Sequence, residues 1–235
     1  MKGLEDQTLE EFAVIGDRHA PLLVVVRLHA LIPRSILTPG APSDVAHRHE
    51  NTAPDGYPDA MPFRLHLGHG ASGNAASMAP FVRGLEARGI AAAAVDLPKR
   101  RAEDVVPVWR AAVPDGPASD VGVGGHSYGG RVASLAAAEP GTDYGALVLF
   151  SYPLHPPGSP ERTEARIAHW PRITCPVLLL SGESDPFARI ELLRAAVPLL
   201  PQAELVTYPR LGHGLIPVLE DVLDRVAAFL SAIEG

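Results

Sequence analysis

Several residue types are scarce in this chain of 235 residues, and each shortage excludes a class of protein. The single cysteine, Cys175, cannot form an internal disulfide. Because it lies at the start of the apolar stretch ITCPVLLL, we expect a small core residue there and not a reactive thiol. Lysine occurs only at positions 2 and 99, and the net charge is -7. This balance argues against nucleic acid or an anionic membrane as the partner.

The chain also lacks a long hydrophobic run. Its first residues, MKGLEDQTLEEF, are acidic and contain no signal-peptide core. The most apolar early stretch, PLLVVVRLHALI, is interrupted by Arg27 and His29 and is too short to span a bilayer. We therefore expect a soluble, cytoplasmic protein. Hydrophobic residues make up 46% of the chain, which suits one packed domain with a large core.

From residue 62 onward, short apolar runs alternate with segments of helical periodicity. We expect strands within residues 63–70, 90–98, 120–127, 145–153, 175–186 and 203–209. We expect helices over residues 74–88, 102–112, 128–138, 188–199 and 214–233. Ser72 or Asn74 is a plausible cap for the first helix.

This alternation predicts an α/β protein, a three-layer α/β/α sandwich with a mostly parallel sheet. Right-handed crossovers would bring the carboxyl ends of the strands to one edge, where such folds carry their sites.

Residues 1–61 do not follow this pattern, so we divide the chain into this N-terminal segment and a domain over residues 62–235. Within the segment, FAVIG and PLLVVVRL could form an antiparallel pair of strands at one edge of the sheet. Residues 33–60 are rich in proline, aspartate and histidine and show no periodicity. We expect an irregular surface loop or extension there.

The stretch VGVGGHSYGGRVAS places Ser127 between glycines where a strand runs directly into a helix. A nucleophile elbow requires this context, because its tight turn lifts the serine Oγ above the sheet edge. The N-terminus of the following helix then points at that oxygen. Gly122 and Gly124 also hint at a dinucleotide-binding loop, but Ser127 stands where its third glycine should be. We therefore interpret Ser127 as a nucleophile.

A serine nucleophile needs a base that is oriented by an acid. In strand–helix folds with such an elbow, the chain order is serine, acid, histidine. Asp185 follows the strand that ends in VLLLSGES, and His213 follows the strand AELVTYP, between two glycines. Glu183 is a rival acid that lies nearer the strand end. We predict a triad of Ser127, His213 and Asp185.

Acyl transfer also needs two backbone N–H donors aimed at the developing oxyanion. One should be the N–H of Tyr128, the residue after the nucleophile. The other should come from the loop in HLGHGASGN, and Ala71 is the best candidate. His69 and His126, which flank these two positions, are candidates for the pocket wall.

The histidines could instead suggest a metal site. His66 and His69 are three residues apart, and His47 and His49 lie upstream. No carboxylate or cysteine stands at ligand spacing on a helix with them, so we expect neither a metal nor another cofactor.

Taken together, these segments resemble the α/β-hydrolases. The resemblance rests on HGASGN, GGHSYGGRVAS, SYPLHPPGSPE, LLLSGESDPF and LGHG, in that order, and covers about residues 62–235. It is closest to the cap-free, dienelactone-hydrolase-like branch. Within that branch it is closest to a family with a vertebrate testis-expressed protein and a subunit of the nonspecific lethal chromatin complex. It implies an α/β-hydrolase fold without a large cap domain and the same triad. It also draws attention to His155 in YPLHPPG, which could line the pocket or belong to a loop shaped for packing.

These observations lead to a serine hydrolase that acts on carboxylic esters or a related small acyl substrate, without a cofactor. The same site could open lactones or transfer acyl groups. A non-catalytic protein-interaction module that keeps the fold is the alternative, because fold does not establish function. The intact triad order argues against that alternative.

Overall fold

The computed structural model describes residues 26–27, 63–113, 116–118 and 120–233. Within these residues, the strands form one sheet in the order β1-β7-β6-β5-β4-β2-β3. The strands are β1 (Val26–Arg27), β2 (Arg64–Gly68), β3 (Ala91–Val95), β4 (Val121–His126), β5 (Ala146–Phe150), β6 (Val177–Gly182) and β7 (Ala203–Tyr208). Strands β2 to β7 run parallel, and β1 pairs antiparallel with β7. The predicted, mostly parallel sheet is confirmed.

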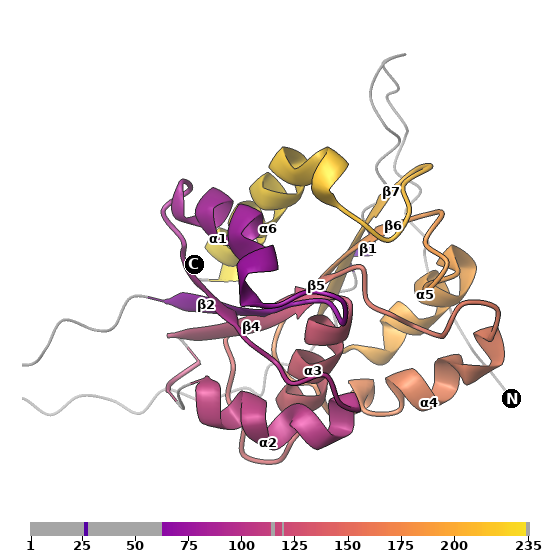
Figure 1. The fold of residues 1–235 in the computed structure, drawn as a ribbon, viewed down its shortest axis with the longest axis horizontal. Helices are drawn as coiled ribbons and strands as arrows, with labels where there is room; N and C mark the ends of the chain where they lie inside the picture. The colour runs from indigo at the N-terminus through magenta and orange to yellow at the C-terminus, as the bar shows by residue number, and fades with distance from the viewer. Residues whose placement is uncertain (1–25, 28–62, 114–115, 119, 234–235) are drawn as a thin grey trace, which may run out of the picture.

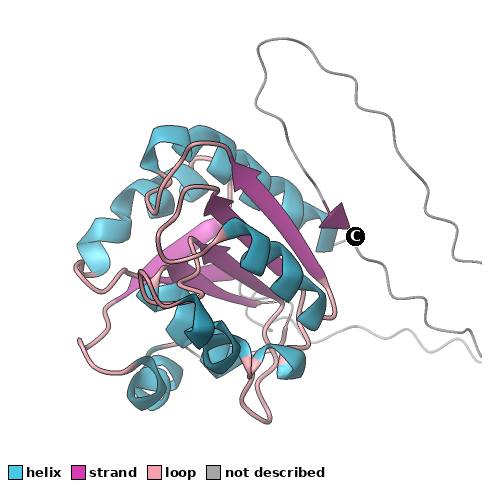
Figure 2. Ribbon diagram, turned by 90° about the vertical axis from the view of Figure 1, so that its right-hand side faces the viewer, coloured by secondary structure: helices cyan, strands magenta, loops and turns pink. Residues whose placement is uncertain are grey.

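Helices cover both faces of this sheet (Figures 1 and 2). The helices are α1 (Ala79–Glu86), α2 (Ala102–Ala112), α3 (Tyr128–Ala137), α4 (Thr163–Ile167), α5 (Ile190–Ala196) and α6 (Leu219–Ile233). Helices α1 and α6 lie on one face, and α2 to α5 lie on the other. In β5, Leu147 and Leu149 belong to the core beneath α3, whereas Val148 and Phe150 belong to the core beneath α1 and α6. Burial on both faces explains why the strands read as continuous apolar runs.

Three predicted helices are divided in the structure, each beside a proline. The first begins as a 3-10 turn (Ala75–Met78) and becomes α1 just before Pro80. Helix α5 ends in a 3-10 turn that contains Pro198, and a 3-10 turn with Pro217 precedes α6. Proline has no N–H to donate to the preceding turn, so it fits the first turn of a new segment better than a helix interior.

The start of the first helix also differs from the expected cap. Asn74 occupies the cap position of the 3-10 turn, but its side chain makes no capping hydrogen bond. The N–H of Ala75 instead donates to Asp96 Oδ1 at 3.0 Å. Asp96, at the exit of β3, therefore accepts the capping hydrogen bond that we expected Ser72 or Asn74 to accept.

Only a small part of the N-terminal segment is described. Val26 and Arg27, within PLLVVVRL, pair with Leu205 and Glu204 as the antiparallel edge strand β1. The stretch FAVIG and residues 33–60 lie outside the described residues.

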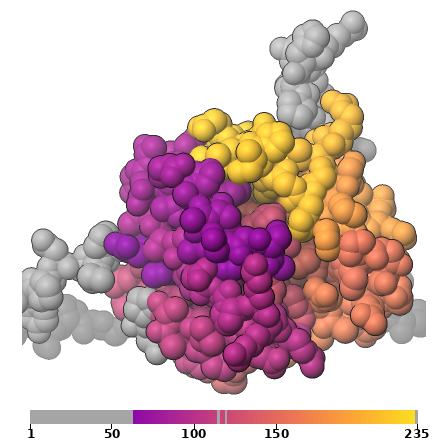
Figure 3. Space-filling model, in the orientation of Figure 1, coloured from indigo at the N-terminus to yellow at the C-terminus, as the bar shows by residue number. Residues whose placement is uncertain are grey.

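The first and last helices of the domain lie side by side (Figure 3). Arg88, just after α1, pairs with Glu220 at 2.8 Å and with Asp224 at 2.7 Å, both on α6. Cys175 is buried as expected, and this burial raises the pKa of its thiol to about 12. No helix among the described residues is long and apolar enough to cross a membrane.

Candidate active site

The backbone at the end of β4 makes a tight, strained turn. Ser127 has φ 51° and ψ -112°, a backbone conformation that residues other than glycine rarely adopt. Its N–H donates to Phe150 O at 2.9 Å, and α3 begins at the next residue. A Cβ added at Gly129 would lie 2.1 Å from the carbonyl carbon of Gly68, so only glycine lets α3 contact the backbone of β2. Strand, turn and helix thus have the geometry of a nucleophile elbow.

Three side chains from separate strand exits meet above this turn. Ser127 Oγ lies 2.8 Å from His213 Nε2, and His213 Nδ1 lies 2.8 Å from Asp185 Oδ2. These residues follow β4, β7 and β6, whose carboxyl ends share one edge of the sheet. The ionised carboxylate can only accept, so Nδ1 carries the proton and Nε2 is free to accept the serine hydroxyl.

Asp185 is shielded from solvent, whereas His213 is partly accessible. The Asp185 side chain is 0% exposed, and the His213 side chain is 22% exposed. Asp185 Oδ1 also accepts the N–H of Phe187 at 2.8 Å, which fixes the carboxylate in the turn after β6.

Phe187 is a site residue that sequence reasoning missed. Its ring lies 4.4 Å from the His213 ring, centroid to centroid, at an interplanar angle of 38°. The only sequence signal is its place in SGESDPF, two residues after the acid, because a single aromatic in a loop has no periodicity to reveal it.

The rival acid has other partners. Glu183 Oε1 accepts Arg194 Nη2 at 2.6 Å and Thr207 Oγ1 at 2.9 Å. Of the two carboxylates at the end of β6, Asp185 is therefore the one that contacts His213.

The loop after β2 borders the serine. A Cβ added at Gly70 would lie 4.0 Å from the Cβ of Ser127, and a turn closes from Gly73 N–H to Gly70 O at 2.9 Å. Ala71 lies in this turn and is exposed. Tyr128 is the first residue of α3, so its N–H has no acceptor within the helix. Both predicted oxyanion donors therefore belong to segments that adjoin Ser127.

His69 does not line a pocket, contrary to the expectation. It is 1% exposed, and its ring bonds only backbone: Nδ1 donates to Gly70 O at 2.8 Å and Nε2 accepts Leu97 N–H at 3.0 Å. Because Nε2 accepts the hydrogen bond from the Leu97 N–H, it holds no proton. The 3.2 Å distance from Nε2 to Asp96 Oδ1 is therefore not an ion pair. His69 instead ties the exit of β2 to the exit of β3.

His126 lies beside the base. Its Nε2 donates to the carbonyl oxygen of His213 at 3.1 Å, and the two ring centroids are 5.1 Å apart. Burial lowers the pKa of His126, which keeps this ring neutral near pH 7. The residue before Ser127 thus bonds the loop that carries His213.

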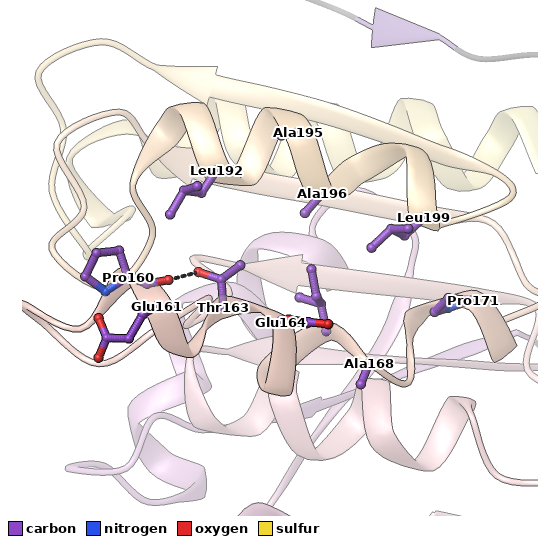
Figure 4. Close-up of a pocket in the computed structure, with 11 residues that line it drawn as sticks. Pro160, Glu161, Thr163, Glu164, Ala168, Pro171, Leu192, Ala195, Ala196 and Leu199 are labelled. Atoms are coloured by element: carbon purple, nitrogen blue, oxygen red, sulfur yellow. Dashed lines mark hydrogen bonds between the residues drawn. The ribbon is translucent and has the colours of Figure 1, made fainter.

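The surface has two hollows, and neither is lined by Ser127 or His213. His155 lines one of about 550 Å³, together with Asp185 and Arg189. The other, of about 420 Å³, lies between α4 and α5 and is lined mainly by apolar side chains (Figure 4). The segment between β5 and β6 holds only α4 and short 3-10 turns, so the described residues contain no large cap domain.

Among the residues that the structure describes, no group of three or more histidine, cysteine, aspartate or glutamate side chains is placed to hold a metal ion. His47 and His49 lie outside those residues. The arrangement found has the parts of a nucleophilic, acid–base site.

Several solved structures share the fold. An esterase of Pyrococcus furiosus is 18% identical, with a TM-score of 0.62 over 75% of this chain and 84% of that one. The monoacylglycerol lipase of Paleococcus ferrophilus is 15% identical, with a TM-score of 0.62 over 72% and 94%. Est1E of Butyrivibrio proteoclasticus, solved with ferulic acid bound, is 21% identical, with a TM-score of 0.58 over 76% and 92%.

No curated protein matches the chain in sequence. A family model does: residues 63–226 match the one described as the alpha/beta hydrolase domain. Because this match covers more than half of the sequence, the chain belongs to the alpha/beta hydrolase family.

Proposed function

We propose that this chain is a serine hydrolase that cleaves carboxylic esters or related small acyl substrates. The observation that carries the proposal is the unbroken pair of 2.8 Å contacts from Ser127 Oγ through the His213 ring to Asp185. A hydroxyl in contact with a neutral imidazole nitrogen, whose other nitrogen donates to a buried carboxylate, is an activated nucleophile.

In the first half-reaction, His213 Nε2 takes the hydroxyl proton while Ser127 Oγ attacks the acyl carbon. The N–H groups of Tyr128 and Ala71 receive the oxyanion of the tetrahedral intermediate. The intermediate collapses, His213 gives its proton to the departing alcohol, and the acyl group stays on Ser127. A water then attacks the acyl carbon while His213 takes its proton. The ester bond to Ser127 breaks, His213 returns the proton to Ser127 Oγ, and the carboxylic acid product leaves.

Asp185 acts through the imidazole. It accepts the hydrogen bond of the Nδ1–H group throughout, so the tautomer is fixed and the imidazolium that forms has a carboxylate beside it. Because that carboxylate is fully buried, its attraction for the imidazolium is weakly screened. The Phe187 ring packs against one side of the imidazole.

The site favours small or slender acyl substrates that reach an open edge. Within the described part of the chain no cap domain closes over Ser127, and Ser127 lines neither of the two hollows. The short segment between β5 and β6 and the five motifs that resemble the dienelactone-hydrolase-like branch support placing the chain there. Esterases and a lipase among the structural neighbours are in keeping with ester chemistry.

Labelling with a fluorophosphonate probe tests the nucleophile, and hydrolysis of short-chain nitrophenyl esters tests turnover. We expect Ser127→Ala to abolish both. Asp185→Asn should lower kcat by on the order of 10³–10⁴, because it favours the wrong tautomer of His213. Glu183→Gln is the matched control, a carboxylate two residues away that should leave kcat unchanged. Wild-type protein that is not labelled at Ser127 would reject the proposal.

A further inference from the structure

The loop after β5, YPLHPPG, has no part in the mechanism above, yet it is firmly held. Ser151, the residue just before this loop, has φ 48°, a left-handed conformation that turns the chain sharply. Its N–H donates to Leu180 O at 2.8 Å. Four residues later, His155 is 4% exposed, so a titratable side chain is buried next to the strand exits. Buried polar groups need partners, and those of His155 show what the loop does.

Both ring nitrogens of His155 bond backbone groups. Nδ1 lies 2.9 Å from Pro156 O, and because a carbonyl can only accept, Nδ1 carries the proton. Nε2 therefore has the lone pair, with which it accepts the N–H of Arg189 at 3.0 Å. The backbone N–H of His155 also donates to Phe187 O at 2.9 Å. Two hydrogen bonds thus run from one residue to the 185–189 turn, which lies more than thirty positions along the chain.

That turn carries the two groups that contact the base. Asp185 accepts a hydrogen bond from His213 Nδ1, and Phe187 places its ring 4.4 Å from the same imidazole. The Phe187 N–H also holds the second oxygen of the carboxylate. Movement of the turn away from His155 would therefore shift both the acid and the aromatic ring relative to His213.

We propose that His155 is a positioning residue that clamps the 185–189 turn and so sets the orientation of His213; this role rests on the function proposed above. A neutral imidazole suits the place, because it supplies a donor on one side and an acceptor on the other without a buried charge. A side chain that lacks the acceptor would leave the Arg189 N–H without this partner and loosen the turn.

Three substitutions separate the acceptor from the bulk of the ring. His155→Leu removes both polar atoms, His155→Asn can replace only the nearer nitrogen, and His155→Gln can return an acceptor near the position of Nε2. We expect the leucine and asparagine variants to lower kcat by about 10-fold and to leave KM within about twofold of wild type. The loss is no larger because the backbone hydrogen bond from His155 N–H to Phe187 O remains. The glutamine variant should stay within about threefold of wild type. If the leucine variant does not fold, the asparagine variant can still be compared with the glutamine variant.

His169→Leu is the matched control. His169 is also a histidine at 4% exposure, but its hydrogen bond goes to Ser134 on α3 and not to the 185–189 turn. It should lower the melting temperature and leave kcat unchanged. Wild-type kcat in both His155→Leu and His155→Asn would overturn the proposal, as would an equal loss of kcat in all three His155 variants.

A second readout does not depend on turnover. Amide hydrogen exchange of the full chain should be faster at Arg189 in His155→Leu than in wild type, because the acceptor of that amide is gone. Unchanged exchange there would overturn the clamp. If the fluorophosphonate probe leaves wild-type Ser127 unlabelled, the proposed function fails, and the exchange measurement still decides whether His155 holds the turn.

Discussion

Acid should destabilise this fold through one buried histidine on the far side of the sheet from α6. His169 is 4% exposed, and its Nε2 lies 2.9 Å from Ser134 Oγ. Burial, followed by the nearby guanidinium groups of Arg131 and Arg172, lowers the pKa of His169 from 6.5 to about 4; Glu103 opposes this in part. The unfolded chain therefore takes up a proton at a higher pH than the folded one.

This difference sets the pH window and the size of the effect. The stability that depends on neutral His169 is intact above pH 6.5 and is lost as the pH falls from 6.5 toward 4. With pKa values of 6.5 and about 4, the loss between pH 7 and pH 5 is about 2 kcal/mol. That is a large share of the stability of a typical domain, which is roughly 5–15 kcal/mol.

Urea unfolding at pH 7, 6 and 5 measures this loss, with His169→Gln as the comparison. Glutamine keeps an N–H donor for Ser134 and does not titrate. His66 and His126, whose pKa values burial also lowers, titrate alike in both proteins and cancel in the difference. We expect wild type to lose about 2 kcal/mol more than the variant between pH 7 and pH 5. Parallel pH dependence in the two proteins would refute the reasoning.

Three further predictions concern packing and reactivity. Gly129→Ala should unfold the protein or lower its melting temperature strongly, because its Cβ would meet the β2 backbone at 2.1 Å; Gly212→Ala, with open space around it, should not. A similar melting temperature for both variants would contradict this. Glu103→Gln should destabilise by about 1–3 kcal/mol, since buried Arg131 loses its carboxylate partner; an unchanged urea midpoint would contradict it. Cys175, whose pKa burial raises to about 12, should resist iodoacetamide at pH 8 until urea unfolds the chain, as mass spectrometry would show.

The sequence predicts the parts of this fold whose signals are local. Strand–helix alternation fixes the order of the layers, and a serine between glycines at a strand–helix junction marks the elbow at Ser127. The topology then brings the exits of β4, β6 and β7 to one edge, which is why Asp185 and His213 could be named from chain order alone. Their separation in sequence does not matter, because parallel strands end together.

The sequence does not reveal contacts that depend on how loops fold. His69 and His126 read alike as pocket candidates, yet one is enclosed with both nitrogens on backbone groups and the other bonds the His213 loop. Phe187 and the clamp at His155 have no periodicity or spacing rule behind them. Such residues become visible only when the partner of each buried polar atom is identified in three dimensions.

At the elbow, α3 and β2 touch through main chain, with glycines at the points of contact. The position of Ser127 is thus set by backbone atoms, which every residue possesses, while the rim around it is made of loop side chains. Exchange of a rim residue should therefore reshape the surroundings of Ser127 and leave its Oγ in contact with His213 Nε2.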